Sequence, residues 1–178
     1  MKNIKYRFLD LKDLDSSLLK KFNRYQETNR VWYEQNGEYG RKADHFVDDW
    51  DDEKKEFVIH SLVNCVKSGG FVAGAFADSD LIGFANVEGE RFGSNHEYLE
   101  LPYIHVSNEI RNSGIGRKLF ELCCKKAKQL GAKKLYIAAH PSEETQHFYR
   151  SVGCTYAAEI NQKIFEKEPL DIQMEITL

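Results

Sequence analysis

The sequence predicts a mixed α/β fold in which a sheet carries helices on both faces. Apolar residues alternate or run continuously over several short segments, which is typical of strands. Between these segments lie others whose apolar residues recur at helical spacing. The resulting order is strand, helices, three antiparallel strands, helix, strand, helix and two strands. Elements in this order bury their apolar surfaces by packing helices against a sheet.

The first half of the chain is expected to start with a strand and to continue in helices. Alternating apolar residues over 4–8 predict the strand. Apolar spacing predicts a helix over 13–25, and residues 28–35 are interpreted as one or two further helical turns. Residues 36–50, which are rich in aromatic and acidic side chains, are expected to be irregular. A strong amphipathic pattern predicts a helix over 52–67.

In the second half, turn and cap residues set the boundaries. Asp78, Ser79 and Asp80 separate two strand-like runs, Gly131 stands where a left-handed residue ends a helix, and Ser142 is a good N-cap. The expected elements are a hairpin of 71–77 and 81–91, a strand at 96–106, a helix at 115–130, a strand at 134–139, a helix at 142–152, and strands at 156–162 and 171–177.

Length and composition limit the classes of protein to which this chain can belong. With 178 residues and 20.6 kDa, the chain is long enough for one domain with a real core, expected to span 1–178. The net charge of −3 argues against general nucleic-acid binding. No apolar run approaches the roughly 20 residues of a membrane span, and no signal-peptide pattern is present, so we expect a cytoplasmic protein. The four cysteines and six histidines show no metal-ligand spacing, so no metal is expected.

A glycine-bearing turn at residues 111–117 is the most informative segment of the chain. It follows a strand-like run and opens a helix, so it exposes backbone N–H groups at the positive end of the helix dipole, which suits phosphate. A P-loop needs Gly-Lys-Ser/Thr here, but Gly116 is followed by Arg117, Lys118 and Leu119. Leu119 also replaces the third glycine of the dinucleotide fingerprint. An ordinary strand-to-helix connection is the alternative.

The remaining pattern is Arg/Gln-x-x-Gly-x-Gly/Ala, with Arg111, Gly114 and Gly116 at its defined positions. It resembles the pyrophosphate loop of the GNAT superfamily of N-acetyltransferases, which bind acetyl-coenzyme A. A second motif follows in the right order: family members carry Phe-Tyr, three residues and then Gly-Phe, and this chain has Phe148-Tyr149 followed by Gly153-Cys154. The resemblance covers the chain from Glu100 onward.

Four positions depart from the family pattern. Ser142 stands where many members carry the Asn that helps to hold the pantetheine arm, and Thr145 stands where many have Ala. Cys154 replaces an aromatic residue, and Ser107-Asn108 replaces the Pro that commonly follows the strand before the loop. These changes weaken the expected side-chain contacts to the cofactor more than the backbone contacts.

The resemblance implies the GNAT fold, a mixed and mostly antiparallel sheet that splays at a V-shaped cleft with helices on both faces. The cleft would lie between the strand that ends at Val106 and the strand at 135–139, with the pantetheine arm bonding to main chain near 104–106. Many members pair, so a homodimer is possible. The residues expected to contact acetyl-CoA are Ile104, His105, Val106, Arg111, Asn112, Ser113, Gly114, Ile115, Gly116, Arg117, Ser142 and Phe148.

Acetyl transfer from a thioester to an amine needs a base for the ammonium, donors for the oxyanion and an acid for the thiolate. The resemblance implies Glu100 as base, because histone-modifying members place a glutamate six residues before the residue that corresponds to Val106. Glu97 and His105 are weaker candidates for the base, and a water relay is a further alternative. Side chains alternate along a strand, so His105 should point away from Glu100 unless a bulge intervenes. The resemblance implies such a bulge. Tyr149 is the expected general acid, with the alternative that it is a packed core residue.

The acceptor is expected to bind at the aromatic and acidic stretch near residues 28–55. Trp32, Tyr33, Asp49 and Trp50 are the candidate contacts, since aromatic faces and carboxylates suit a cationic amine. The alternative is that these acids form a helix N-terminus and a solvated loop.

The sequence as a whole predicts an N-acetyltransferase in which a primary amine of a small molecule or peptide attacks acetyl-CoA directly in a ternary complex. The acceptor stays open between polyamine, aminoglycoside, amino acid and peptide N-terminus. A non-catalytic acyl-CoA-binding module on the same fold is the main alternative, and a nucleotide-phosphate enzyme is a more remote one.

Overall fold

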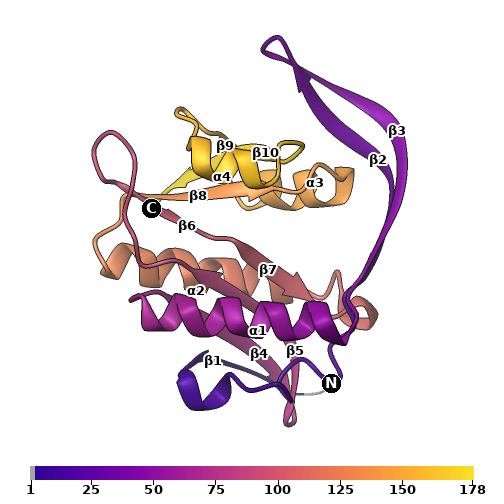
Figure 1. Cartoon of the computed structure of the whole chain (residues 1–178), viewed down its shortest axis with the longest axis vertical. Coiled ribbons are helices and arrows are strands. Elements are labelled where there is room, and N and C mark those ends of the chain that lie inside the picture. Colours follow the sequence, from indigo (N-terminus) through magenta and orange to yellow (C-terminus); the bar gives the residue numbers. More distant parts are fainter. Residues whose placement is uncertain (1–2) are drawn as a thin grey trace.

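The structure is a computed structural model that describes residues 3–178. Its strands form two four-stranded sheets and a separate two-stranded ribbon, with helices around them (Figure 1). The first sheet has the order β1-β4-β5-β7, and each neighbouring pair is antiparallel. Its strands are β1 (Ile4–Leu9), β4 (Phe71–Ala77), β5 (Asp80–Val87) and β7 (Tyr103–Val106).

The second sheet has the order β6-β8-β10-β9, in which only β6 and β8 run parallel. Its strands are β6 (Tyr98–Glu100), β8 (Lys134–Ala139), β10 (Ile172–Thr177) and β9 (Thr155–Tyr156). Consecutive strands β6 and β7 therefore belong to different sheets. The sheets meet where the Glu88 N–H donates to the Glu100 carbonyl (2.9 Å); the Leu101 N–H still donates to the Tyr136 carbonyl of β8, and from Tyr103 onward the chain pairs with the first sheet. The mixed, mostly antiparallel sheet that the sequence predicts is confirmed.

Two helices cover opposite faces of the first sheet. Helix α2 (Ile115–Gln129) packs its buried residues, such as Leu119, against Ala73 and Ala75 of β4. Helix α1 (Asp52–Lys67) packs on the other face, where Leu62 meets Phe84. Because side chains alternate along a strand, one sheet can serve both cores. The helix predicted at 52–67 and the strands predicted at 71–77 and 134–139 match the structure.

The helix predicted over 13–25 is wrong. A short 3₁₀ helix η1 (Leu11–Asp13) is followed by turns. The side chain of Asp15 accepts a hydrogen bond from the Ser17 N–H (2.8 Å), and Asp10 caps η1. Such local bonds from aspartate to the backbone compete with helix formation. Leu19 and Phe22 are buried all the same, so the apolar spacing reflected burial and not a helix.

The helical turns predicted at 28–35 and the irregular segment predicted at 36–50 are also wrong. These residues form the long ribbon of β2 (Tyr25–Gln35) and β3 (Glu38–Asp49). The tip is Asn36-Gly37, both with positive φ (55° and 82°), which is the turn geometry that a two-residue hairpin favours. Figure 1 shows this β2–β3 hairpin curving away from the first sheet and alongside the second.

The C-terminal region differs from the prediction in part. The strand predicted at 156–162 is only β9, and the chain then forms helix α4 (Gln162–Lys167). The side chain of Asn161 caps α4 by accepting from the Ile164 N–H at 3.2 Å. The predicted strand at 96–106 is divided into β6 and β7. Within residues 3–178, no helix has both the length and the apolar character needed to cross a membrane.

Contacts with the second sheet hold the hairpin in place. The Trp32 N–H donates to the Pro141 carbonyl (2.8 Å), Val31 forms a bridge with Ser142, and Tyr39 stacks on Tyr156 with ring centres 3.8 Å apart. Helix α3 (Glu143–Ser151) begins at this junction. The hairpin thus lies against the second sheet and the start of α3, where it forms one wall of the cavity described next.

Candidate active site

A large cavity lies between the two sheets and is closed on one side by the β2–β3 hairpin. The segment 111–117, strand β7, helix α3 and the region of α4 also line it. The segments predicted to bind a cofactor and those predicted to bind an acceptor therefore share one space.

Segment 111–117 presents a row of free main-chain donors to this cavity. Gly114 is the N-cap of α2 with φ +82°, and no side chain caps this helix. The first helical bond runs from the Lys118 N–H to the Gly114 carbonyl (3.1 Å). Within the described chain, the N–H groups of residues 112–117 donate to no protein acceptor. Unsatisfied donors at a helix N-terminus favour a bound anion.

Two arginines brace this segment. The Arg111 guanidinium donates to the carbonyls of Val106 (3.2 Å) and Tyr25 (2.7 Å), and Arg117 donates to the Ser151 carbonyl (3.1 Å). Their charges stay close to the free amides while their hydrogen bonds fix the backbone. Gly116 lies under the Phe148 ring, where an added Cβ would come within 3.3 Å of it. Phe148 thus packs directly on the turn.

Strand β7 points its side chains to the two cores in alternation. Ile104 and Val106 pack on the α2 side, whereas Tyr103 lies on the α1 side with His105. The Arg24 Nε–H donates to His105 Nδ1 at 3.1 Å. Burial, together with the charges of Arg24 and Arg111, holds the pKa of His105 well below its ordinary value. A neutral imidazole whose Nδ1 already accepts a hydrogen bond is poorly suited to remove a proton from the acceptor.

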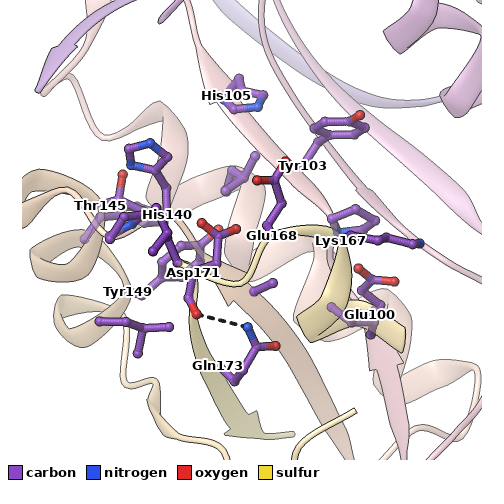
Figure 2. A pocket seen from close by; sticks show the side chains of 18 of the residues that line it. Glu100, Tyr103, His105, His140, Thr145, Tyr149, Lys167, Glu168, Asp171 and Gln173 are labelled. Carbon is purple, nitrogen blue, oxygen red and sulfur yellow. Dashed lines mark hydrogen bonds between the residues drawn. The ribbon is translucent and has the colours of Figure 1, made fainter. Parts of the chain in front are cut away.

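Glu100 stands at the end of β6 and lines the cavity. Burial raises its pKa to about 6, with Lys167 opposing the shift and Glu88 adding to it. Figure 2 shows Glu100 beside Lys167, set apart from Tyr149. A carboxylate in this state is a competent base near neutral pH.

Tyr149 lies on α3, nine-tenths or more buried, and still lines the cavity. Its ring packs edge-on against Phe120 with ring centres 6.2 Å apart. Burial, the charge of Cys154 and that of Asp171 hold the pKa of the Tyr149 hydroxyl well above its usual range. The phenol therefore stays protonated at any physiological pH and is available as a hydrogen-bond donor.

The Ser142 side chain has a structural role at the start of α3. Its hydroxyl caps α3 by accepting from the Thr145 N–H (3.2 Å), accepts from Gln26 Nε2 (3.3 Å) and donates to Thr145 Oγ1 (2.9 Å). With these three bonds made, the side chain has little capacity left for the pantetheine arm, a role that the family gives to Asn.

The four residues predicted to bind the acceptor divide into two groups. Trp32, Tyr33 and Trp50 line the cavity, and the Trp32 ring already contacts the guanidinium groups of Arg150 (4.2 Å to the ring centre) and Arg41 (5.3 Å). Asp49 does not line it, because alternation along β3 turns this side chain to the other face. On β3 the acidic residues that line the cavity are its neighbour Asp48 and Asp44.

Asp171 is a cavity residue that the sequence did not single out. It precedes β10 and lies next to Tyr149 in Figure 2, with Glu168 above it. Burial raises its pKa to about 7, and the charges of Glu168 and Asp48 add to the shift. Nothing in the local sequence distinguishes this aspartate, because its surroundings come from β3, α3 and the end of α4.

The fold and this site agree with the comparisons. A model of the acetyltransferase (GNAT) family matches residues 23–154, well over half of the chain. No curated protein sequence gives a significant match.

Solved structures share the architecture over nearly their whole length. A nourseothricin acetyltransferase is 19% identical with a TM-score of 0.71, each chain being covered to 98%. A putative streptothricin acetyltransferase from Bacillus anthracis, in complex with acetyl coenzyme A, is 16% identical with a TM-score of 0.73 and 99% coverage of both chains. A GNAT acetyltransferase from Elizabethkingia anophelis with acetyl-CoA bound is 18% identical, with a TM-score of 0.60 and full coverage. Together with the family match, the cavity and its turn of free amides identify this chain as a member of the GNAT family of acetyltransferases.

Proposed function

We propose that residues 1–178 act as one N-acetyltransferase domain, in which a primary amine attacks acetyl-CoA directly in a ternary complex. The observation that carries this proposal is the row of unpaired N–H groups at 112–117, which opens on the same cavity as Tyr149. Both sheets and the β2–β3 hairpin contribute walls to that cavity, which supports one domain with one site.

In this proposal the diphosphate of acetyl-CoA binds the free amides of 112–117. The pantetheine arm follows main chain near Ile104, His105 and Val106, in a V-shaped opening between β7 and β8. No strand pair joins β7 to β8 in the described part of the chain, so polar main-chain groups along this edge are free for the arm. The thioester then lies near Tyr149.

The reaction forms one C–N bond and breaks one C–S bond. The ammonium first gives one proton to a base, and the free amine then attacks the thioester carbon. When the adduct collapses, the sulfur leaves as a thiolate, and the nitrogen loses a second proton. Tyr149 donates its hydroxyl proton toward the sulfur and regains one from solvent, so the products are an N-acetyl amine, a free thiol and one released proton. A backbone N–H near Val106 is the proposed donor to the oxyanion.

Glu100 is the proposed base, acting through water because it stands apart from Tyr149 (Figure 2). Only the carboxylate form can accept a proton, so kcat/KM should rise as the pH passes through about 6, the pKa of Glu100. In the Glu100→Gln variant this rising limb should flatten, and kcat/KM should fall by about 100-fold. A pH–rate profile from pH 5 to 9 measures both.

Glu97→Gln is the matched control, since Glu97 directly precedes β6, pairs with Lys134 at 3.7 Å and, unlike Glu100, does not line the cavity. Its profile should follow that of the unmodified protein. A rising limb that persists in Glu100→Gln but disappears in Asp171→Asn would transfer the role of base to Asp171.

The acceptor is a cationic amine in this proposal, because the cavity wall combines Trp50 with Asp48 and Asp171. Nourseothricin belongs in the first panel of acceptors because of the neighbour named above, alongside a polyamine, an aminoglycoside, amino acids and a peptide. Release of free thiol from acetyl-CoA is the readout. Thiol release with at least one amine is expected, whereas binding of CoA with no turnover across the panel would favour a non-catalytic acyl-CoA-binding module.

A further inference from the structure

A buried arginine in the cavity wall has a terminal nitrogen that donates to no described residue. Arg24 precedes β2 and is only 7% exposed. Its Nε donates to His105 and its guanidinium lies 5.6 Å from the centre of the Trp50 ring. One terminal nitrogen, Nη1, is buried and makes no hydrogen bond to any described residue. Burial and the charge of Arg111 lower the pKa of Arg24 to about 10, which still leaves it charged at neutral pH. A buried unpaired donor on a charged group costs more than an ordinary one, so the site is incomplete without an acceptor.

A carboxylate oxygen in the same cavity wall lacks a hydrogen-bond donor. Oδ2 of Asp48 is buried and accepts no hydrogen bond from residues 3–178. The nearest basic group is Nε2 of His140 at 3.6 Å. Burial lowers the pKa of His140, so this ring is neutral near pH 7 and does not balance the charge of Asp48.

Arg24 and Asp48 lie near each other but do not form an ion pair. Strand pairing sets Gln26 opposite Asp48 and Tyr25 opposite Asp49, so Arg24, one residue before β2, lies on the same face as Asp48 and diagonal to it. Across the described chain, however, no nitrogen of Arg24 comes within 4.0 Å of an oxygen of Asp48. Both residues line the cavity. A gap between a buried guanidinium and a half-buried carboxylate, one oxygen of which is buried, fits a group that carries both charges on neighbouring atoms.

An α-amino-acid group has this charge pattern. Its carboxylate can accept from Arg24 while its ammonium donates to Asp48, which satisfies both unpaired atoms with charge-assisted hydrogen bonds. A neutral amide would supply only partial charges, and a diamine would leave Arg24 facing a second cation. Water is the remaining occupant, and it would bring no specificity.

The rest of the cavity indicates which nitrogen reacts. An ammonium held by Asp48 keeps its proton and has no lone pair with which to attack the thioester. Asp48 lies 3.6 Å from Nε2 of His140, and Figure 2 shows His140 near Asp171 and Tyr149, so the gap is close to the proposed reaction centre. Figure 2 shows Asp171 and Tyr149 at this end of the cavity. A second amine on the same molecule can therefore extend to the thioester.

We propose that the acceptor is a diamino acid, with its α-carboxylate bound to Arg24, its α-ammonium bound to Asp48 and its side-chain amine presented beside Tyr149. This inference rests on the proposed acetyl transfer and adds the class of acceptor.

Three amines of matched length test the proposal: L-lysine, cadaverine, which lacks the carboxylate, and 6-aminohexanoate, which lacks the α-ammonium. With saturating acetyl-CoA, kcat/KM for lysine should exceed that for each of the others at least tenfold, the effect of one buried charged hydrogen bond. In Arg24→Met the ratio of lysine to cadaverine should fall to near 1. In Asp48→Asn the ratio of lysine to 6-aminohexanoate should fall in the same way.

Arg30→Met is the control. Arg30 is an arginine on β2, which Arg24 precedes, but it is exposed and pairs with Glu143 at 3.3 Å. It should retain the preference for lysine. Circular dichroism and thermal unfolding show whether each variant is folded before its ratio is interpreted.

Norleucine, which has the α-amino-acid group but no second amine, gives a readout without turnover. Calorimetry should detect its binding to the protein saturated with CoA, and binding should weaken at least tenfold in Arg24→Met. Equal rates for lysine and cadaverine, or no heat with norleucine, would overturn the diamino-acid proposal while leaving acetyl transfer to other amines intact. Absence of thiol release with every amine would instead overturn the proposed function, and a norleucine signal that depends on Arg24 would still support the amino-acid site.

Discussion

Replacing Tyr149 with phenylalanine should lower kcat by about 100-fold or more, with little change in the affinity for acetyl-CoA. The ring would keep its contact with Phe120, and only the hydroxyl at the cavity surface would be lost. Because the pKa of this hydroxyl is held above its usual range, the group stays protonated and, in the proposed role, donates a hydrogen bond to the leaving sulfur. The loss should therefore appear across the whole pH range. Steady-state rates of thiol release, combined with calorimetry for CoA, separate the chemical step from binding.

Tyr6→Phe is the matched control. Tyr6 is a partly buried tyrosine on β1 that packs against the same apolar core and is absent from the cavity lining. Its kcat should equal that of the unmodified protein. Full turnover by Tyr149→Phe would show that Tyr149 has a packing role only, the alternative that the sequence left open.

Replacing Gly114 with valine should raise the dissociation constant for CoA at least tenfold. Gly114 has φ +82°, a conformation that costs an L-residue about 1–2 kcal/mol, and the space around its missing Cβ is open for 4 Å. A side chain would both strain the backbone that aims the free amides and enter the space where the diphosphate is proposed to bind. Calorimetry with CoA measures the loss.

Gly69→Val is the control for strain. Gly69 follows α1 with φ +88°, and nothing lies within 4 Å of its missing Cβ, so the backbone penalty is matched. It does not line the cavity. Both variants should lose similar thermal stability, but only Gly114→Val should lose affinity for CoA. Equal affinities in the two variants would contradict the assignment of 111–117 as the diphosphate site.

The elements that the sequence predicted well are those with a strong local pattern. Helix α1, helix α2 and strand β8 combine clear periodicity or an apolar run with a cap or glycine at the boundary. The turn at 111–117 belongs with them, because its glycines and the following helix are adjacent in the chain. Free amides at a helix N-terminus are a local property, so the expectation of an anion site did not need the tertiary structure.

The β2–β3 hairpin shows where local reasoning failed. Asn36-Gly37 is a strong hairpin signal, whereas the spacing and composition of the aromatic and acidic residues around it predict helical turns and a loop. That error had a consequence for the site. Neighbouring side chains on a strand face opposite sides, so Asp48 lines the cavity and Asp49 does not.

The sequence by itself determined the family motifs, the mixed α/β class and the position of the turn with free amides, since each depends on residues close together in the chain. Tertiary structure alone decided which charged groups meet in the cavity. Arg24, Asp48 and Asp171 come from three distant segments, and their unpaired or shifted states arise from burial beside one another. Burial and through-space charge are properties of the folded arrangement, which is why the neutral state of His105 and the gap between Arg24 and Asp48 could be found only there.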